Sequence, residues 1–363
     1  MRVLIAGGGT GGHLFPGIAV AEEVLARGGE VLFVGTERGI EARVLPELGL
    51  PLRTIRVQGL ARVSWKQRLQ FLVDAPVAAF QAIDVLASFR PQVVVGVGGY
   101  SSGPVVLAAA AAFVPTVILE QNSVPGITNR LLGRVVRQVF GAFEESRLHF
   151  PAGKMQLLGN PVRRSIVEAL RGADDELTHL SNGRLNVLAF GGSQGARFLN
   201  ECFMEAAPAL AEQAVALVHQ TGEADHARVS QAYAAAGLQA EVVPFISDMA
   251  ARYAQADLIV CRAGATTLSE LAIVGRPAVL VPFPYATHNH QESNAREYEG
   301  RGAALCRPQR DLDGTILVNL IRELADDEPR RTAMAVAMRA LGRPRAAASI
   351  VDRLEALGRR QTS

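Results

Sequence analysis

The sequence has little cysteine, and the cysteines it has are not arranged as a site. Cys202, Cys261 and Cys306 are widely spaced and form no C-x-x-C pair. An odd, scattered set of thiols offers no disulfide framework, so we expect reduced cysteines and a cytoplasmic setting.

The sequence also lacks a hydrophobic run long enough to cross a membrane. Its longest apolar stretch, from Val105 to Leu119, is broken by Pro115. It falls short of the ~20 residues that a spanning helix needs. Met1 leads directly into an apolar strand pattern, which leaves no room for a signal peptide. We therefore expect a protein that is soluble or lies on a membrane surface.

Neither sign of charge dominates, because 37 Lys and Arg stand against 35 Asp and Glu. This balance gives no reason to expect a nucleic-acid partner. Basic and apolar residues do alternate between positions 53 and 72, namely Arg53, Arg56, Arg62, Trp65, Lys66, Arg68, Leu69, Phe71 and Leu72. Such a stretch is typical either of a helix lying on an anionic membrane or of an ordinary amphipathic core helix.

Short β-rich runs alternate with helical patterns along all 363 residues, and the alternation restarts near the middle of the chain. Examples are the strand patterns at 3–6, 31–34 and 93–97 and again at 186–190, 214–220 and 257–261. This order predicts an α/β protein with two doubly wound parallel sheets. The Asn160-Pro161 step marks the expected junction, with domains at 1–160 and 161–341 and a terminal helix at 342–358.

Two stretches of the chain repeat one device, an apolar strand followed by a glycine-rich turn. They lie at residues 3–13 (VLIAGGGTGGH) and 187–197 (VLAFGGSQGAR). Such turns expose backbone N–H groups at a helix start, where the helix dipole also favours an anion. Two copies suggest two nucleotide-type domains facing each other across a cleft.

The first turn satisfies G-x-G-x-x-G with Gly7, Gly9 and Gly12, which is a weak sign of dinucleotide binding. Glu37 follows the next strand, so an NAD(P) oxidoreductase stays open on this loop alone. His13 stands where the helix begins, and the dipole there favours a neutral imidazole that could act as a general base. The alternative is a histidine that only packs or caps.

Polar and glycine-rich segments also follow the next strands. Residues 97–104 contain Gly98, Gly99, Tyr100 and Ser101, which either bind a second phosphate or only form a tight turn. Glu120 and Asn122 follow the next strand, at the sheet edge where open α/β sheets bind ligands. Glu120 could orient His13 or bind a hydroxyl group, and Asn122 suits an amide or sugar; a merely structural role is the alternative.

In the second half, residues 261–270 run from strand through loop to helix. Thr266 and Thr267 offer donors at the helix start, and Glu270 follows one turn later, which suits a nucleotide diphosphate and its ribose. A capping box from Thr267 to Glu270 would give the same spacing. The run 288–291, with His288, His290 and Gln291, lacks the acidic or thiol partners of a metal site and better fits sugar hydroxyls. We expect no metal and no cofactor.

Taken together, seven stretches closely resemble the MurG family of peptidoglycan N-acetylglucosaminyltransferases. They are 7–17 (GGGTGGHLFPG), 96–104 (GVGGYSSGP), 120–122 (EQN), 159–163 (GNPVR), 191–197 (GGSQGAR), 261–270 (CRAGATTLSE) and 289–295 (NHQESNA). The resemblance spans nearly the whole chain. It implies the GT-B fold, two Rossmann-like domains with a last helix returning to the first.

The resemblance also implies roles for individual residues. UDP-N-acetylglucosamine would be bound by Thr10, Gly11, Gly12, Asn122, Arg163, Ser193, Ile246, Ala265, Thr266, Thr267, Leu268, Ser269, Glu270 and Gln291. The lipid-linked acceptor, lipid I, would be bound by Gly9, Gly98, Gly99, Tyr100 and Ser101. The candidate bases are His13 and Glu120. The basic stretch 53–72 would face the cytoplasmic side of the cell membrane, and proteins of cell-wall synthesis are conceivable partners.

The hypothesis is an inverting, metal-independent transfer of N-acetylglucosamine to the C4 hydroxyl of lipid I, giving lipid II and UDP in peptidoglycan synthesis. UDP would leave against the helix start at Thr266 and Thr267. The alternatives are a UDP-N-acetylglucosamine epimerase, a GT-B enzyme with another acceptor, an NAD(P) oxidoreductase, and a UDP-sugar sensor without catalysis.

Overall fold

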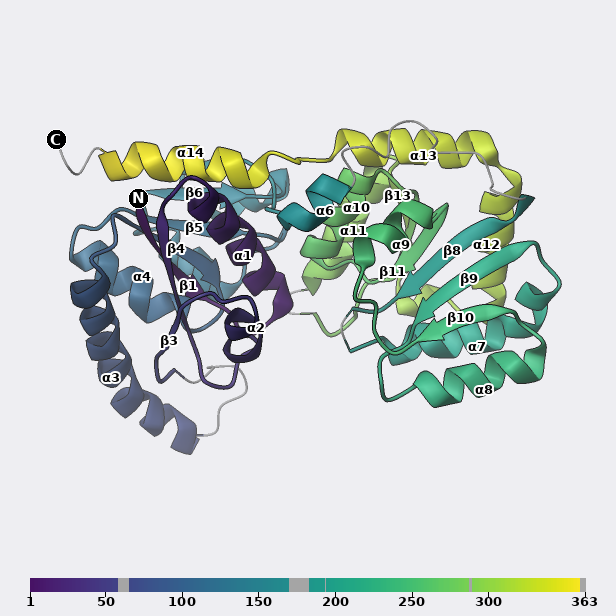
Figure 1. Cartoon of the computed structure of the whole chain (residues 1–363), viewed down its shortest axis with the longest axis horizontal. Helices are drawn as coiled ribbons and strands as arrows, with labels where there is room; N and C mark the ends of the chain where they lie inside the picture. Colours follow the sequence, from purple (N-terminus) through teal and green to yellow (C-terminus); the bar gives the residue numbers. More distant parts are fainter. Residues whose placement is uncertain (58–64, 170–182, 193, 287–288, 360–363) are drawn as a thin grey trace. The chain divides into compact units, whose positions relative to one another are not determined.

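The computed structural model describes residues 1–57, 65–169, 183–192, 194–286 and 289–359, and for residues 65–75 and 169 it describes the backbone only. The chain forms two compact units (Figure 1). Unit 1 comprises Met1–Arg164 and Arg343–Ser363, and unit 2 comprises Ser165–Gly342. Each unit has a parallel sheet of its own, so the alternating pattern of the sequence corresponds to two α/β domains.

Unit 1 contains a seven-stranded parallel sheet with the strand order β3-β2-β1-β4-β5-β6-β7. The direction of winding reverses between β1 and β4, which makes the carboxyl ends of these two strands the switch point of the sheet. The strands are β1 (Arg2–Gly7), β2 (Glu30–Gly35), β3 (Leu52–Thr54), β4 (Val93–Gly98), β5 (Thr116–Glu120), β6 (Gln138–Gly141) and β7 (Met155–Leu157).

Alternate residues of the unit 1 strands enter two different cores, one on each face of the sheet. Val3 and Ile5 of β1 belong to the core under α1 (Gly11–Ala26) and α14 (Ala346–Arg359). Leu4 and Ala6 belong to the core under α3 (Trp65–Phe89) and α4 (Ser102–Ala111). Burial on both faces explains why these strands are continuously apolar. The other helices of the unit are α2 (Glu41–Glu47), α5 (Ile127–Leu132) and the 3-10 helix η1 (Glu144–His149).

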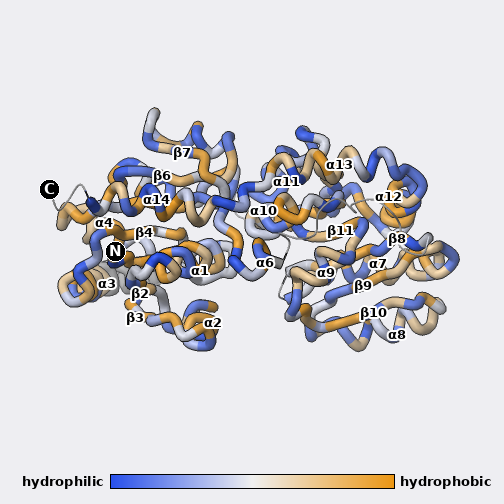
Figure 2. The backbone as a smooth tube through the Cα atoms, turned by 45° about the horizontal axis from the view of Figure 1, so that its top comes forward, coloured by the Kyte–Doolittle hydropathy of each residue, from blue (hydrophilic) through white to orange (hydrophobic). Residues whose placement is uncertain are grey.

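The last helix of the chain, α14, completes unit 1. Its residues Ile350, Val351 and Leu354 are fully buried in the same core as β1 and α1. Arg27 at the end of α1 pairs with Asp352 at 2.7 Å on the outer side of this contact. Figure 2 shows hydrophobic and hydrophilic residues following each other along the outer helices, as expected of helices with one buried face.

Unit 2 contains a six-stranded parallel sheet with the order β10-β9-β8-β11-β12-β13, so its switch point lies between β8 and β11. The strands are β8 (Leu185–Phe190), β9 (Val215–Gln220), β10 (Ala240–Val243), β11 (Leu258–Cys261), β12 (Ala278–Leu280) and β13 (Ala304–Cys306). The helices are α7 (Arg197–Ala211), α8 (His226–Ala236), α9 (Met249–Gln255), α10 (Ala265–Val274), α11 (His290–Gly300), the 3-10 helix η4 (Gln309–Asp311), α12 (Gly314–Asp326) and α13 (Glu328–Ala340). α6 (Arg164–Ala169) begins at the boundary between the units.

Candidate functional site

Unit 1 has two glycine loops, the first after β1 and the second after β4. They lie against each other at the switch point of its sheet. The Gly8 N–H donates to the Gly98 carbonyl oxygen at 3.3 Å. A Cβ atom on Gly99 would come within 2.6 Å of the Gly8 carbonyl oxygen, so the two backbones are in direct contact. The loops after β1 and β4, which the sequence suggested as two phosphate sites, therefore form one surface.

His13 belongs to this surface. Its ring packs on Gly98, where an added Cβ would lie 2.7 Å from Cδ2 and 2.9 Å from Nε2 of the imidazole. Its Nδ1 lies 3.2 Å from the Thr10 hydroxyl. His13 lies in the first turn of α1. The structure thus places the imidazole beside both loops.

The remaining loop residues differ in what they can offer to a ligand. The N–H of Gly9 donates to the carboxylate of Glu41 at 2.7 Å, so this group serves the fold of the loop. Tyr100 is exposed, whereas Ser101 is buried at the start of α4. Ser102, the next residue, closes the turn by donating from its hydroxyl to the Gly99 carbonyl oxygen at 2.8 Å.

Glu120, the other candidate base, ends β5 and is 2% exposed. Its Oε1 accepts the N–H of Asn122 at 2.9 Å, and its Oε2 accepts Nδ2 of Asn129 at 2.9 Å. Burial raises the pKa of the Glu120 carboxyl to about 7, and the hydrogen bonds from Asn122 and Asn129 oppose the rise. A carboxyl group with a pKa near the working pH can both take and give a proton.

Arg163 lies in unit 1, although the expected junction at 160 put it in the second domain. Its guanidinium carbon stands 4.9 Å from the centre of the Phe15 ring on α1, a cation–π contact that holds it to this unit. The division of the chain comes between Arg164 and Ser165.

In unit 2, the glycine loop of residues 191–197 follows β8 at the switch point. The Gly195 N–H donates to the Gly192 carbonyl oxygen at 2.8 Å, which closes the turn before α7. The loop packs on the backbone of Thr221 at the end of β9. Ser193, the expected phosphate donor, lies outside the described residues, as does His288.

The loop after β11 leads into α10, which begins at Ala265 with Gly264 as the N-cap. Thr267 is therefore inside the first turn, and the capping box from Thr267 to Glu270 is wrong as an interpretation. Glu270 is buried, and its Oε2 accepts the hydroxyl of Tyr253 at 2.9 Å. The predicted carboxylate is thus held in place from α9 behind the helix start.

Not every residue of this run can contact a ligand through its side chain. Leu268 is fully buried in the core of unit 2, and its N–H donates to the Gly264 carbonyl oxygen at 2.9 Å. The Ser269 hydroxyl donates back to the Ala265 carbonyl oxygen at 2.9 Å. These two residues build the helix start that presents Thr266 and Thr267.

Gln291 lies in the first turn of α11, and its Oε1 accepts the N–H of Phe283 at 2.9 Å. A sugar contact of this side chain would therefore be a donation from Nε2. Ile246, expected near uracil, is buried. Among the residues that the structure describes, no group of three or more His, Cys, Asp or Glu side chains could hold a metal ion.

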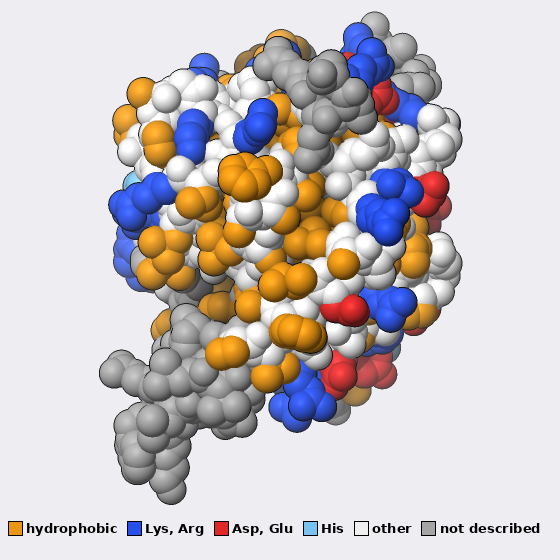
Figure 3. Space-filling view, turned by 90° about the vertical axis from the view of Figure 1, so that its left-hand side faces the viewer, with side chains coloured by type: hydrophobic (Ala, Val, Ile, Leu, Met, Phe, Trp, Pro, Cys, Tyr) orange, Lys and Arg blue, Asp and Glu red, His pale blue; other side chains and the backbone are white. Residues whose placement is uncertain are grey.

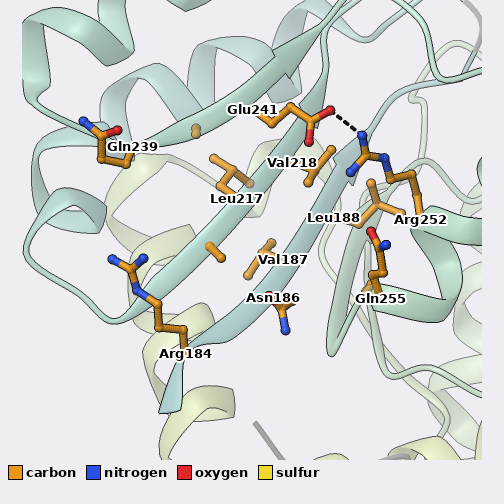
Figure 4. A pocket seen from close by; sticks show the side chains of 13 residues that line it. Arg184, Asn186, Val187, Leu188, Leu217, Val218, Gln239, Glu241, Arg252 and Gln255 are labelled. Atoms are coloured by element: carbon orange, nitrogen blue, oxygen red, sulfur yellow. Dashed lines mark hydrogen bonds and ion pairs between the residues drawn. The ribbon is translucent and has the colours of Figure 1, made fainter. Parts of the chain in front are cut away.

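A separate hollow of about 410 Å³ opens on the sheet of unit 2, beside β8, β9, β10 and α9. Figure 4 shows the ion pair between Arg252 and Glu241 at its rim, with Leu188 and Val218 on its floor. It is bordered by none of the predicted site residues, and it lies away from the loops at the switch point.

Sequence reasoning missed several residues of this arrangement, among them Glu41 and Tyr253. Each is buried and contacts a site segment distant in sequence, the first glycine loop and Glu270 respectively. A single sequence carries no spacing signal for such contacts, since they depend on which elements pack together.

Family models match both units. The glycosyltransferase family 28 N-terminal domain matches residues 3–141, and the glycosyltransferase family 28 C-terminal domain matches residues 186–350. The fold and the two switch-point loops therefore define a glycosyltransferase built from two Rossmann-like domains.

Similar proteins show which family of glycosyltransferases this is. UDP-N-acetylglucosamine--N-acetylmuramyl-(pentapeptide) pyrophosphoryl-undecaprenol N-acetylglucosamine transferase of Myxococcus xanthus is 50% identical over 97% of this chain and 92% of its own length. The protein of the same name from Geotalea daltonii is 46% identical over 98% of this chain and 97% of its own length. The crystal structure of Acinetobacter baumannii MurG is similar with a TM-score of 0.80 and 33% identity, covering 98% of this chain and 99% of that one. The chain belongs to the MurG family.

More distant structures share the fold alone. One is UDP-GlcNAc 2-epimerase from Neisseria meningitidis, with a TM-score of 0.69 at 14% identity over 98% of this chain and all of that one. Membership of the MurG family decides against the oxidoreductase, epimerase and sensor alternatives. Among the described residues, the longest and most apolar helices fall short of what crossing a bilayer requires.

Proposed function

We propose that this enzyme transfers N-acetylglucosamine from UDP-N-acetylglucosamine to the C4 hydroxyl of the muramoyl-pentapeptide of lipid I, giving lipid II and UDP with inversion at the anomeric carbon. The observation that carries the proposal is the packing of His13 on the second glycine loop, because it brings a base and two anion-binding turns to one switch point. The relatives named for this reaction share about half of the sequence with the chain.

The donor is bound by unit 2 in this proposal. Backbone N–H groups at the start of α10, with Thr266 and Thr267, meet the diphosphate, and Glu270 binds the ribose hydroxyls. Gln291 donates to the sugar from Nε2, while its Oε1 accepts the Phe283 N–H. The resemblance to the family assigns further donor contacts to Ser193 and Ile246 of unit 2 and to Thr10, Gly11, Gly12, Asn122 and Arg163 of unit 1.

The acceptor is bound by unit 1, with its diphosphate at the glycine loops, next to Tyr100 and Ser101. The C4 hydroxyl loses its proton to a base as its oxygen attacks the anomeric carbon, and the bond to UDP breaks on the opposite face. Helix-start N–H groups stabilise the charge that develops on the leaving diphosphate. His13 is the proposed base, and Glu120 is the rival or the helper.

The test measures UDP release with UDP-N-acetylglucosamine, with and without a soluble lipid I analogue. We expect release only when the acceptor is present. His13→Ala or Glu120→Gln should lower kcat by about 10²-fold or more, with little change in donor affinity, because general-base catalysis supplies about this much. Glu144→Gln is the matched control, since Glu144 is exposed on the same unit. Near-normal turnover of both H13A and E120Q would show that the base assignment is wrong.

The pH profile separates the two bases. If Glu120 takes the proton, kcat rises as pH passes through about 7, where the Glu120 carboxyl ionises. That rise should persist at reduced rate in H13A and vanish in E120Q. If the rise persists in E120Q, Glu120 is not the base.

We also propose that unit 1 lies on the cytoplasmic face of the membrane, where the undecaprenyl acceptor is anchored. Figure 3 shows hydrophobic side chains gathered on one face of this unit, with Lys and Arg around them. Exposed apolar residues belong to α3, α4, the turn after α4, α5 and η1, including Phe80, Ile83, Leu107, Phe113, Ile127, Leu131 and Leu148. Arg53 and Arg56 of the expected basic stretch are exposed, and the side chains of 58–75 lie outside the described residues.

A further inference from the structure

The buried carboxylate of Glu41 is hydrogen-bonded to the first glycine loop. Glu41 opens α2 and is completely buried. Its Oε2 accepts the Gly9 N–H at 2.7 Å, and its Oε1 accepts the Thr36 N–H at 2.8 Å and the Thr36 hydroxyl at 3.0 Å. A charged group removed from water needs such donors, and hydrogen bonds to an ionised acceptor are the strong ones.

The chain leaves room for this carboxylate at three glycines. A Cβ atom on Gly8, Gly35 or Gly39 would come within 2.5, 2.5 or 2.1 Å of the Glu41 side chain. Gly35 and Gly39 do not adopt the left-handed backbone conformation, so space for the carboxylate is the physical reason for glycine there. Gly8 follows β1, Gly35 ends β2 and Gly39 lies in the turn before α2, so three separate positions enclose a single side chain.

The first glycine loop is hydrogen-bonded both to the enclosed carboxylate and to the loop after β4. Glu41 binds Gly9, while the neighbouring Gly8 donates to the Gly98 carbonyl oxygen. The loop then runs directly into α1, where His13 packs on Gly98. A shift of the Gly9 peptide would therefore move the helix start and the imidazole together.

We propose that Glu41 is a positioning residue of the transfer reaction. It touches no substrate; it takes the Gly9 N–H and so sets the position of the loop and of His13. This inference rests on the proposed function, because the loop matters for turnover only if the acceptor and the base meet there.

The test compares two substitutions at the same cluster. Glu41→Gln keeps the size of the side chain but replaces one oxygen by an NH₂ group, which cannot accept a hydrogen bond. With the amide oxygen facing the two donors of Thr36, the NH₂ group faces the Gly9 N–H and that bond is lost. Thr36→Val is the matched control, since it removes the hydroxyl bond to the same carboxylate and leaves the bond to Gly9.

We expect E41Q to lower kcat about tenfold to a hundredfold, the scale of a misplaced catalytic group, with KM for UDP-N-acetylglucosamine changed less than about twofold. T36V should keep kcat within about twofold of the parent enzyme, although both variants lower the thermal midpoint. Hydrogen exchange of the peptide covering residues 7–13 should quicken in E41Q and stay unchanged in T36V. If E41Q does not fold, Glu41→Asp withdraws the carboxylate by one carbon and should show the same loss of kcat.

Wild-type kcat in E41Q or E41D would overturn the inference, as would an equal loss in T36V. An unchanged exchange rate at residues 7–13 in E41Q would also overturn it. If the parent enzyme releases no UDP with the acceptor, the proposed function fails, and the exchange comparison still decides whether Glu41 holds the loop.

Discussion

Gly98 leaves the space in which the ring of the candidate base, His13, lies. Its φ of +98° lies in the region that L side chains rarely adopt, and the His13 ring occupies the place of a Cβ atom. Its neighbour Gly99 meets the first loop in the same way, so the glycines of the second loop are explained by close contact as well as by the turn. A resemblance in sequence indicates such glycines, but only the structure shows what each one touches.

Replacing Gly98 by alanine should therefore displace the His13 imidazole. We expect G98A to lower kcat by about 10²-fold and to destabilise the protein by about 1–3 kcal/mol through backbone strain. Gly126→Ala is the control, because a Cβ there meets nothing within 4 Å. Kinetics and thermal unfolding of both variants check this; equal kcat values in G98A and G126A would contradict it.

His219 is a buried residue whose role concerns stability. It is fully buried in unit 2, and its Nδ1 lies 2.6 Å from the Tyr233 hydroxyl. Burial lowers the pKa of His219 from 6.5 to about 3, because a charged imidazole would lose its hydration there. Folding therefore keeps this ring neutral in the range where the unfolded chain takes up a proton.

The stability of unit 2 should consequently fall as pH drops from about 6.5 toward 3. Its free energy of unfolding should decrease by up to about 1.4 kcal/mol per pH unit from this residue alone. Urea unfolding at a series of pH values measures how steeply the free energy of unfolding changes with pH. His219→Asn should reduce this slope by up to about 1.4 kcal/mol per pH unit, which corresponds to one proton. A slope that is the same in parent and variant would show that His219 is not the group responsible.

At the scale of elements, α14 at the end of the chain packs into the core of unit 1 that lies under α1. Leu354 is fully buried beside β1 and α1, so its side chain stabilises unit 1 from more than 300 residues away in sequence. Leu354→Ala should cost about 2–5 kcal/mol by leaving a cavity. Leu148→Ala, at an 87% exposed leucine of the same unit, should cost less than about 0.5 kcal/mol. Urea unfolding of the two variants checks the difference, and equal losses would contradict the packing of α14.

For some elements the local sequence pattern was sufficient for a prediction. The strands β1, β2, β4, β8, β9 and β11 were predicted because apolar runs define them locally. The edge strands β3 and β13, each three residues long, were not predicted. The capping box at Thr267, which the sequence left open as an alternative, is wrong because α10 begins at Ala265; the local sequence alone fits both starting points.

At the scale of the whole molecule, the apolar surface of unit 1 predicts membrane binding without a spanning segment. Phe80 on α3 and Phe113 after α4 are 76% and 83% exposed, and the two helices pack against each other. A double substitution, Phe80→Glu with Phe113→Glu, should weaken binding to anionic lipid vesicles at least tenfold, because it removes apolar contact and adds repulsion. UDP release with a soluble acceptor should stay unchanged.

Val336→Glu provides the control for this experiment. Val336 is 62% exposed on α13 of unit 2, so the substitution adds one glutamate to an exposed apolar position outside unit 1. Vesicle co-sedimentation of the three proteins measures the effect. Equal binding by the double variant and the parent protein would refute a membrane role for this face.

The sequence by itself determined the two α/β domains and the positions of the glycine turns, because strand and helix periodicity and turn chemistry are local properties. The resemblance to MurG added candidate roles for His13, Glu120 and Glu270. Only the tertiary structure decided which groups these residues meet. Glu41 occupies the Gly9 N–H, Tyr253 holds Glu270, and burial raises the pKa of Glu120 to about 7. Contact and burial arise between segments distant in the chain, so they follow from packing.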